Sequence, residues 1–381
     1  MLISKQLAGI YLHIPFCRGK CAYCDFYSVA TSKYQEDFVK ALGKEIHIQK
    51  DYLQNEPIQT IYFGGGTPSL LKTDQLDYII SEIKKNFKLE ENKEITLEAN
   101  PDDLTHDYLK SIRQLGFNRL SIGIQSFNDQ DLKRMKRKHT VNQAISSIRY
   151  AQDIGFNNIS IDLIYGLPDL NLKDWGTNID KAFDLNIQHI SAYHLTIEPK
   201  TLFYKYYQND KLNLPTEKES LDQFKMLIAK TKENGFLHYE ISNFAQDGSI
   251  SLHNTNYWMG VKYLGLGPSA HSYNLTSRQW NIQNLRGYLD GILKGKIPNE
   301  QEILTEKEKF NEFLITSLRT MCGISTERLK KEFGKEYYDF FITKSKKYLS
   351  NNLMINIANN FILTEKGMFI SDSIMQDFFH D

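Results

Sequence analysis

Short apolar runs recur along the first half of the chain, and longer stretches with a helical period separate them. Six of the short runs are rich in β-branched and aromatic residues, as strands are. They cover residues 9–15, 58–64, 94–100, 119–126, 158–166 and 189–195. Helical patterns lie near residues 33–53, 74–87, 105–115, 141–154, 172–185 and 217–234. This alternation predicts βαβ units and a parallel sheet.

The number of repeated units predicts how far the sheet closes. Crossovers between parallel strands are right-handed, so successive units curl the sheet in one direction. Six units are fewer than the eight of a closed barrel, so we predict an α/β fold with a partial (β/α)6 barrel. Glycine and polar motifs follow the carboxyl ends of the strands, where parallel α/β folds form their sites. The pattern therefore predicts one site at one mouth of the barrel.

The second half of the chain departs from this alternation. Residues 240–281 are rich in Asn, Gly, Ser and Tyr. Beyond residue 296 the chain is more charged, with helical patterns at 304–321 and 325–348 and a tail that predicts a hairpin followed by a helix. We therefore predict two domains: a core over residues 1–295, and a small, mostly helical, winged-helix-like domain over residues 296–381.

Composition and charge narrow the class of protein. The 381 residues are 41% hydrophobic and 24% charged, which is typical of a globular protein. Lys and Arg together number 46, as do Asp and Glu, so no basic domain indicates a nucleic-acid partner. The amino terminus lacks a signal-peptide pattern, and no apolar run approaches the ~18 residues of a membrane span. These features predict a cytoplasmic protein and leave peripheral membrane contact open.

Three of the four cysteines lie within eight residues. Cys17, Cys21 and Cys24 form a C-x3-C-x2-C motif after the first predicted strand. Thiolates are the usual ligands of iron–sulfur clusters, and three of them would leave the fourth iron of a cubane open. The alternatives are a zinc site, which lacks a close fourth ligand here, and structural thiols. Cys322 stands alone, and we expect it to be a small buried residue.

The cysteine motif is part of a larger resemblance. YLHIPFCRGKCAYCDF, YFGGGTPS, EANP, SIGIQSFN and IDLIYGLP occur in this order over residues 11–168, with Arg137 between the last two. This set resembles the oxygen-independent coproporphyrinogen III oxidase-like branch of the radical S-adenosylmethionine (SAM) superfamily. The resemblance implies a [4Fe–4S] cluster on Cys17, Cys21 and Cys24, and a bound SAM.

The same resemblance assigns candidate cofactor contacts. For the first SAM it implies packing by Tyr11, with Tyr23 beside it in the cysteine loop. It also implies contacts from Gly65, Gly66 and Thr67, and a polar anchor at Glu98. For a second SAM, present in the oxidase, it implies Gln125, Arg137 and Asp162. An arginine can hold the SAM carboxylate bidentately. The alternative for Asp162 is a buried polar residue that bridges strand ends, and the number of SAM molecules stays open.

Three features favour one kind of member within this branch. Phe26 replaces a cysteine of the oxidases, only ten residues precede the YLHIPF motif where the oxidases carry an additional arm, and residues 253–258 read HNTNYW. This HNxxYW pattern resembles the haem chaperones of the HemW type. The resemblance implies delivery of haem to haem-dependent proteins, such as respiratory membrane proteins, and a dimer of the cluster-loaded form. The alternative is the oxidase, which decarboxylates propionates with a 5′-deoxyadenosyl radical.

His253 is the candidate haem ligand. Histidine is the commonest axial ligand type, and Tyr257 and Trp258 offer flat faces to a porphyrin. The alternative is a hydrogen-bonded histidine in a Gly/Asn-rich loop, with His271 as the rival ligand. We expect His13, next to the cysteine motif, to support the cluster from outside its ligand set.

Overall fold

The computed structural model describes residues 7–380 and contains one curved sheet of twelve strands within that range. Seven neighbouring strands are parallel. In sheet order they are β9 (Tyr263–Leu266), β1 (Ala8–Ile14), β2 (Ile58–Gly65), β3 (Leu89–Ala99), β4 (Arg119–Gln125), β5 (Ile159–Tyr165) and β6 (His189–His194). The six predicted strands are confirmed, and β9 is an additional parallel strand beside β1.

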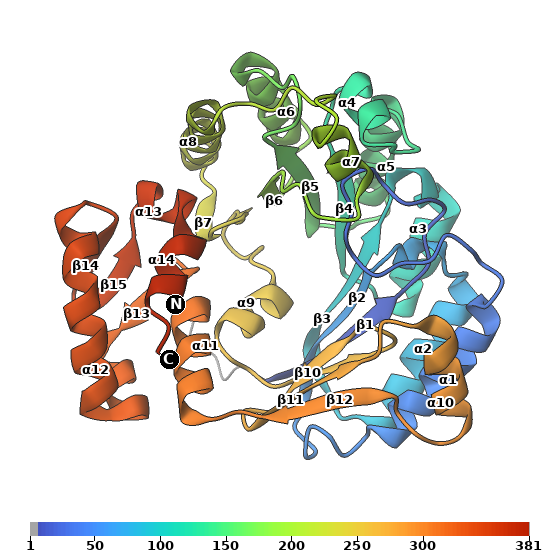
Figure 1. Cartoon of the computed structure of the whole chain (residues 1–381). Coiled ribbons are helices and arrows are strands. Elements are labelled where there is room, and N and C mark those ends of the chain that lie inside the picture. Colours follow the sequence, from blue (N-terminus) through green and yellow to red (C-terminus); the bar gives the residue numbers. More distant parts are fainter. Residues whose placement is uncertain (1–6, 381) are drawn as a thin grey trace.

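Helices cover the outer, convex face of this sheet (Figure 1). The six predicted helices are present as α1 (Gln35–Ile48), α2 (Thr73–Asn86), α3 (His106–Leu115), α5 (Val141–Asp153), α6 (Leu172–Asp184) and α8 (Glu217–Glu233). Three shorter helices are α4 (Asp129–Arg134), α7 (Leu202–Tyr207) and α10 (Leu285–Leu293). The sheet stays open between its edge strands, so the prediction of an α/β partial barrel is confirmed.

Antiparallel strands extend both edges of the parallel sheet. One edge adds β8 (Asn243–Ala245) and β7 (Leu237–Glu240), and the other adds β10 (His271–Tyr273), β11 (Ser277–Asn281) and β12 (Asn299–Ile303). Most of these residues belong to the segment that breaks the βα alternation in the sequence.

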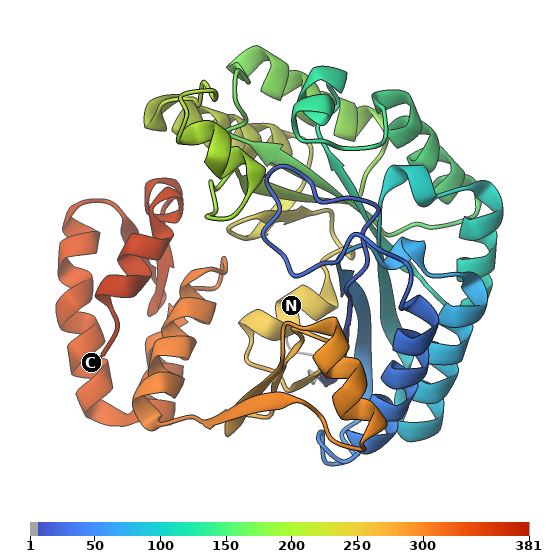
Figure 2. The same cartoon turned by 45° about the vertical axis from the view of Figure 1, so that its right-hand side comes forward.

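The same segment contributes a helix to the concave side of the sheet, α9 (Leu252–Trp258) (Figure 2). It contacts β1 and β2 on one side and the carboxyl-terminal helix α11 on the other. The expectation of a loop around His253 is wrong, because the Ser251 side chain accepts a hydrogen bond from the Asn254 N–H and caps a helix there.

The carboxyl-terminal region has its own hydrophobic core, built from residues between Phe310 and Phe378. It comprises α11 (Glu306–Leu318), β13 (Ile324–Ser325), α12 (Thr326–Ser350), β14 (Met354–Ile357), β15 (Asn360–Leu363), α13 (Glu365–Phe369) and α14 (Ser371–Asp377). The predicted helices and the hairpin followed by a helix are confirmed. The large sheet extends to Ile303 through β12, and the division at residue 296 stays a prediction.

The carboxyl-terminal region stands opposite the concave side of the barrel (Figures 1 and 2). Within residues 7–380, no helix is both long enough and apolar enough to cross a membrane.

Glu45, a fully buried carboxyl group on α1, holds the β9 side of the barrel in place. Its two oxygens accept hydrogen bonds from the Gly267 N–H at 2.7 Å, the Asn281 amide at 2.6 Å and the Tyr288 hydroxyl at 2.6 Å. These donors belong to the turn after β9, to β11 and to α10. Burial raises the pKa of Glu45, and the three hydrogen bonds oppose that rise. One side chain therefore ties three later segments to the first helix.

We predict that Glu45→Ala destabilises the protein by roughly 3 kcal/mol or more, because each buried donor left without an acceptor costs about 1–3 kcal/mol. Glu45→Gln retains an acceptor oxygen and should lose less. Urea unfolding measures both, with Lys40→Ala on the exposed face of α1 as the control. Equal midpoints for Glu45→Ala and Lys40→Ala would contradict the anchoring role of Glu45.

Candidate functional site

The three cysteines of the C-x3-C-x2-C motif lie half-buried on the loop after β1. Two residues outside this loop, one after β2 and one after α4, donate to their sulfur atoms. The Thr67 hydroxyl lies 3.5 Å from the Cys17 Sγ, and the Arg137 Nη1 lies 3.6 Å from the Cys21 Sγ. The loop therefore brings its thiols to the carboxyl ends of the strands, where the sequence predicts a site.

The chemistry of this loop fits a cubane cluster. Burial raises the pKa of the Cys24 thiol, and charges on Cys21 and Cys17 raise it further, so the three sulfurs lie within electrostatic reach of one another. No group of three or more His, Cys, Asp or Glu in the described part of the chain converges on a single metal ion. A cubane cluster needs no such convergence, because each of its thiolates binds a different iron.

Cys322 takes no part in this arrangement. It lies after α11, in the carboxyl-terminal region, and is exposed. The expectation that it is buried is wrong, because the turn between α11 and β13 carries it to the surface.

The glycine segment after β2 packs tightly against the end of β1. Gly65 has a φ of 105°, and a Cβ there would meet the His13 ring at 2.7 Å. The Gly66 N–H donates to the Ile14 carbonyl at 2.8 Å, and a Cβ at Gly66 would lie 2.7 Å from the Phe16 carbonyl oxygen. Only glycine fits at these two positions, so the backbone runs directly beside the cysteine loop.

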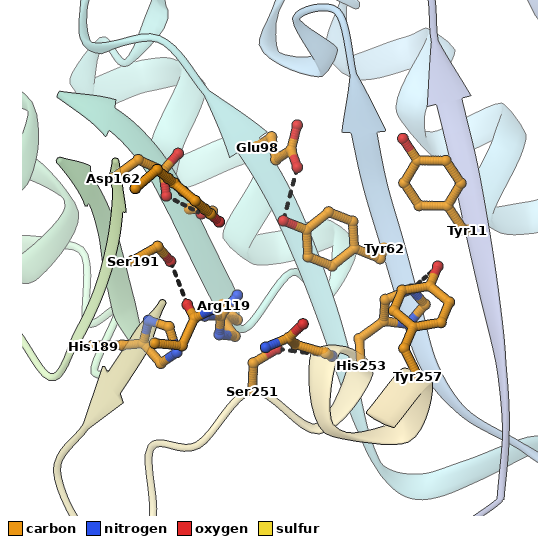
Figure 3. Close-up of a pocket in the computed structure, with 14 residues that line it drawn as sticks. Tyr11, Tyr62, Glu98, Arg119, Asp162, His189, Ser191, Ser251, His253 and Tyr257 are labelled. Atoms are coloured by element: carbon orange, nitrogen blue, oxygen red, sulfur yellow. Dashed lines mark hydrogen bonds between the residues drawn. The ribbon is translucent and has the colours of Figure 1, made fainter. Parts of the chain in front are cut away.

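Two carboxyl groups, Glu98 on β3 and Asp162 on β5, face the interior of the barrel. Glu98 accepts hydrogen bonds from the Tyr62 hydroxyl at 2.8 Å and the Gly65 N–H at 3.1 Å (Figure 3). Burial, together with the charge of Asp162, raises the pKa of Glu98 to about 7. Burial raises the pKa of Asp162 to about 6, although the Ser121 hydroxyl donates to it at 3.4 Å. Both carboxyls therefore titrate near neutrality.

Gln125 and Arg137 lie at the carboxyl end of β4 and beyond it. Gln125 is buried and has a φ of 69°, a strained conformation for a residue with a side chain. The Arg137 Nη2 donates to the Asn100 side chain at 2.6 Å and to the Gly123 carbonyl at 2.5 Å. With its contact to Cys21, the guanidinium of Arg137 is already engaged by the protein.

The candidate tyrosines occupy two different places. Tyr11 on β1 stacks with Tyr62, with ring centroids 6.1 Å apart, and its hydroxyl lies 3.2 Å from the His13 Nδ1. Tyr23, within the cysteine loop, is partly buried against the main core. Burial raises its pKa, and the nearby Arg137 lowers it. Tyr11 therefore lines the barrel interior, whereas Tyr23 lies beside the cysteines.

His253 is buried inside the barrel, with both ring nitrogens engaged. Its Nδ1 lies 2.7 Å from the Thr60 hydroxyl and its Nε2 lies 3.0 Å from the Tyr257 hydroxyl. The ring stacks on Tyr62, with centroids 5.0 Å apart. Burial, together with the positive charge of Arg119, lowers the pKa of His253 to about 3, so the imidazole is neutral.

The other two candidate histidines lie nearer the cysteine loop. His13 is buried and contacts the Tyr11 hydroxyl and, at 2.9 Å, the Tyr27 carbonyl. His271 on β10 is exposed, stacks on Trp280, and lies close enough to His13 to lower the pKa of that residue. Of the three histidines, only His271 presents its ring to solvent.

A polar cavity of about 230 Å³ lies between the barrel wall and α9. Four of the candidate residues line it: Tyr11, Glu98, Asp162 and His253. Sequence reasoning missed Tyr62, Arg119, Ser121, His189 and Ser191, which also line it. The two-residue period of the strands could have identified such positions, because it places Arg119, Ser121 and Gly123 on the same side of β4. The remaining candidates gather at the cysteine loop instead.

Comparisons with known proteins agree with this architecture. The family model of the Radical SAM superfamily matches residues 11–182, and that of the HemN C-terminal domain matches residues 304–370. The structure of coproporphyrinogen III oxidase (HemN) from Escherichia coli superposes with a TM-score of 0.86 at 22% identity. That superposition covers 98% of this chain and 90% of the other, and it supports the fold.

Relatives with higher sequence identity cover nearly the whole chain. "Heme chaperone HemW" of Bacillus subtilis is 34% identical over 98% of this chain and 99% of its own length. "Heme chaperone HemW" of Lactococcus lactis is 32% identical over 97% of both chains. Membership of the Radical SAM superfamily implies a [4Fe–4S] cluster and SAM, and the thiols after β1 fit such a cluster. The chain thus belongs to the HemW family of the Radical SAM superfamily.

Proposed function

We propose that this protein is a haem chaperone that binds haem and passes it to haem-dependent proteins. The observation that carries the proposal is the 34% identity to a heme chaperone over 98% of the chain. The position of the HNxxYW segment supports it, because His253 and Tyr257 line a polar cavity inside the barrel. A neutral imidazole at the wall of a cavity has the chemistry of an axial haem ligand.

We assign the iron ligand to the Nε2 of His253. The Nδ1–H would remain hydrogen-bonded to the Thr60 hydroxyl, as ligating histidines usually keep a partner on their second nitrogen. The Tyr257 hydroxyl occupies Nε2 and must move away before iron can bind. The cavity is smaller than the 300–1,000 Å³ of typical ligand pockets, so it must also widen to admit a porphyrin.

We assign the [4Fe–4S] cluster to Cys17, Cys21 and Cys24, where it would supply one-electron chemistry toward SAM. Arg137 and Thr67 donate hydrogen bonds to two of the sulfurs, and such donors tune the reduction potential of clusters.

We also assign the contacts to the first SAM by position. They are Tyr11, Tyr23, Gly65, Gly66, Thr67 and Glu98. A second SAM at Gln125, Arg137 and Asp162 would compete with contacts that Arg137 already makes to Asn100, Gly123 and Cys21. These contacts favour a role for Arg137 in holding the cysteine loop.

The proposal extends to partners. We propose that the acceptors include respiratory proteins, met at the membrane surface by peripheral contact, and that the cluster-loaded form dimerises.

We predict that replacing Cys17, Cys21 or Cys24 by Ala abolishes the cluster, because each thiolate would hold a different iron. Anaerobic reconstitution followed by iron and sulfide analysis and visible absorption measures this. Cys322→Ala is the matched control and should load fully. On size-exclusion chromatography the wild type should shift to a dimer on loading, and the three variants should not. A loaded Cys21→Ala protein would contradict the assignment.

We predict that wild-type protein binds haem stoichiometrically and that His253→Ala weakens binding at least tenfold, because the axial ligand is lost. Titration of haem into the reconstituted protein, followed in the Soret band, measures the affinity. His271→Ala is the matched control, since that histidine is exposed and lies outside the cavity lining.

Other outcomes of this titration have definite meanings. A loss of affinity in His271→Ala alone would move the iron ligand to the exposed histidine. Absence of specific haem binding by the wild type would overturn the chaperone proposal. Conversion of coproporphyrinogen III to protoporphyrinogen IX by the same sample would then assign the oxidase reaction.

We predict that Tyr257→Phe tightens haem binding by a few fold, because it removes the hydroxyl that competes with iron for the His253 Nε2. The Phe ring keeps the packing against Tyr263, whose centroid lies 4.5 Å away. The same Soret titration measures the effect. Weaker binding in Tyr257→Phe would contradict this geometry and indicate that the phenol itself contacts haem.

A further inference from the structure

Arg119 carries a positive charge into the interior of the barrel without a protein partner. It is the first residue of β4 and is 2% exposed. Its guanidinium forms no hydrogen bond or ion pair with any described residue, and its Nε is fully enclosed without a partner. Buried charges are ordinarily paired because their desolvation is costly. An unpaired guanidinium at a cavity wall therefore calls for a partner that comes from outside the chain.

The groups around Arg119 do not supply that partner. Glu98 is bound by Tyr62 and Gly65, and Asp162 by Ser121. The charge of Arg119 lowers the pKa of both carboxyl groups, but neither forms an ion pair or a hydrogen bond with its guanidinium. The ring nitrogens of His189 are engaged by the hydroxyls of Ser160 and Tyr239. Arg119 is the only Lys or Arg among the residues that line the cavity.

A second orphaned polar group lies beside Arg119. Thr96 is its register partner on β3, and the Thr96 hydroxyl is buried without a hydrogen-bond partner among the described residues. Arg119 itself faces the cavity next to His189 and Ser191 (Figure 3). Two side chains with an unsatisfied polar group thus lie next to each other on adjacent strands, and Arg119 is the one that lines the cavity.

We propose that Arg119 binds the carboxylate of a ligand in this cavity. A guanidinium matches a carboxylate through two parallel hydrogen bonds. Two ligands of this family carry that group: haem, on its propionates, and SAM, on its methionine part. Haem is the first of these ligands to test, and this choice rests on the proposed function. Arg119 and His253 line the same cavity, so one haem can reach both residues.

The cavity has room for an acid side arm. Its volume of about 230 Å³ is below that of typical pockets for whole ligands. A propionate can enter beside Arg119 while the cavity widens around the macrocycle. The raised pKa of Glu98, about 7, limits repulsion of an incoming carboxylate, because this group is partly protonated at neutral pH.

The test compares haem with haem dimethyl ester, whose propionates are uncharged, on the wild type, Arg119→Gln and Arg119→Lys. Arg149→Gln, on the exposed face of α5, is the matched control. We expect the wild type to bind haem about 10- to 100-fold more tightly than the ester. Arg119→Gln should lose that preference, and Arg119→Lys should retain part of it. The affinity for the ester should be the same in all four proteins.

Stability and SAM binding complete the test. Loss of an unpaired buried charge should leave the unfolding midpoint of Arg119→Gln at or above that of the wild type. If Arg119→Gln does not fold, the inference is judged by whether the wild type binds haem more tightly than haem dimethyl ester. SAM titrated into the same reconstituted proteins is the second arm, read as a dissociation constant.

The outcomes separate this inference from the proposed function. If haem binds equally well to the wild type and Arg119→Gln, and SAM does too, the carboxylate site is overturned while the chaperone stands. If the wild type binds no haem, the chaperone proposal is overturned, and SAM binding then decides whether Arg119 holds a carboxylate. Weaker SAM binding in Arg119→Gln would then support the site with SAM as its ligand, and unchanged SAM binding would overturn it.

Discussion

The carboxylate of Glu94 on β3 holds α9 inside the open barrel. Its two oxygens accept hydrogen bonds from the backbone N–H groups of Leu252 and His253, each at 3.0 Å. These N–H groups lack partners within the helix, and a carboxylate at a helix amino terminus is also favoured by the helix dipole. Because α9 is fixed at this point, His253 and Tyr257, four residues apart, project from one side of the helix into the cavity. The cavity exists because this helix occupies one side of the barrel.

A polar interior is the consequence of leaving the barrel open. In a closed barrel the inward side chains pack in apolar layers. Here the inward positions of β2 to β6 carry hydroxyl, carboxyl, imidazole and guanidinium groups, and nearly all of them are paired with one another. Thr60 pairs with His253, Tyr62 with Glu98, and Ser160 with His189. Arg119 and the Thr96 hydroxyl beside it are the exceptions, and an unpaired charge in a network that is otherwise nearly satisfied indicates a place kept for a ligand.

Local patterns predicted most of the fold, and long-range packing accounts for what they missed. The strands and helices before residue 235 follow from period and turn residues, and the cysteine motif follows from spacing alone. The place of α9 depends on Glu94, more than 150 residues earlier in the chain, and β9 joins β1 across a still longer separation. Arg119 looked like an ordinary strand residue because nothing near it in sequence reveals the missing partner. The assignment of Arg137 to SAM rests on resemblance. The contacts of Arg137 to Cys21 and Asn100 can be recognised only in the three-dimensional structure.

Glu98 joins the two parts of the site. One of its oxygens holds the Gly65 N–H, in the glycine segment that runs beside the cysteine loop, and the other holds the Tyr62 hydroxyl, whose ring stacks on His253. A carboxylate accepts both hydrogen bonds more strongly than a protonated carboxyl does, and the pKa of Glu98 near 7 puts the two forms in balance. Through these two hydrogen bonds one ionisable group connects the glycine segment beside the cysteine loop with the aromatic ring on which His253 stacks. The position of His253 and the position of the glycine segment therefore depend on the same side chain.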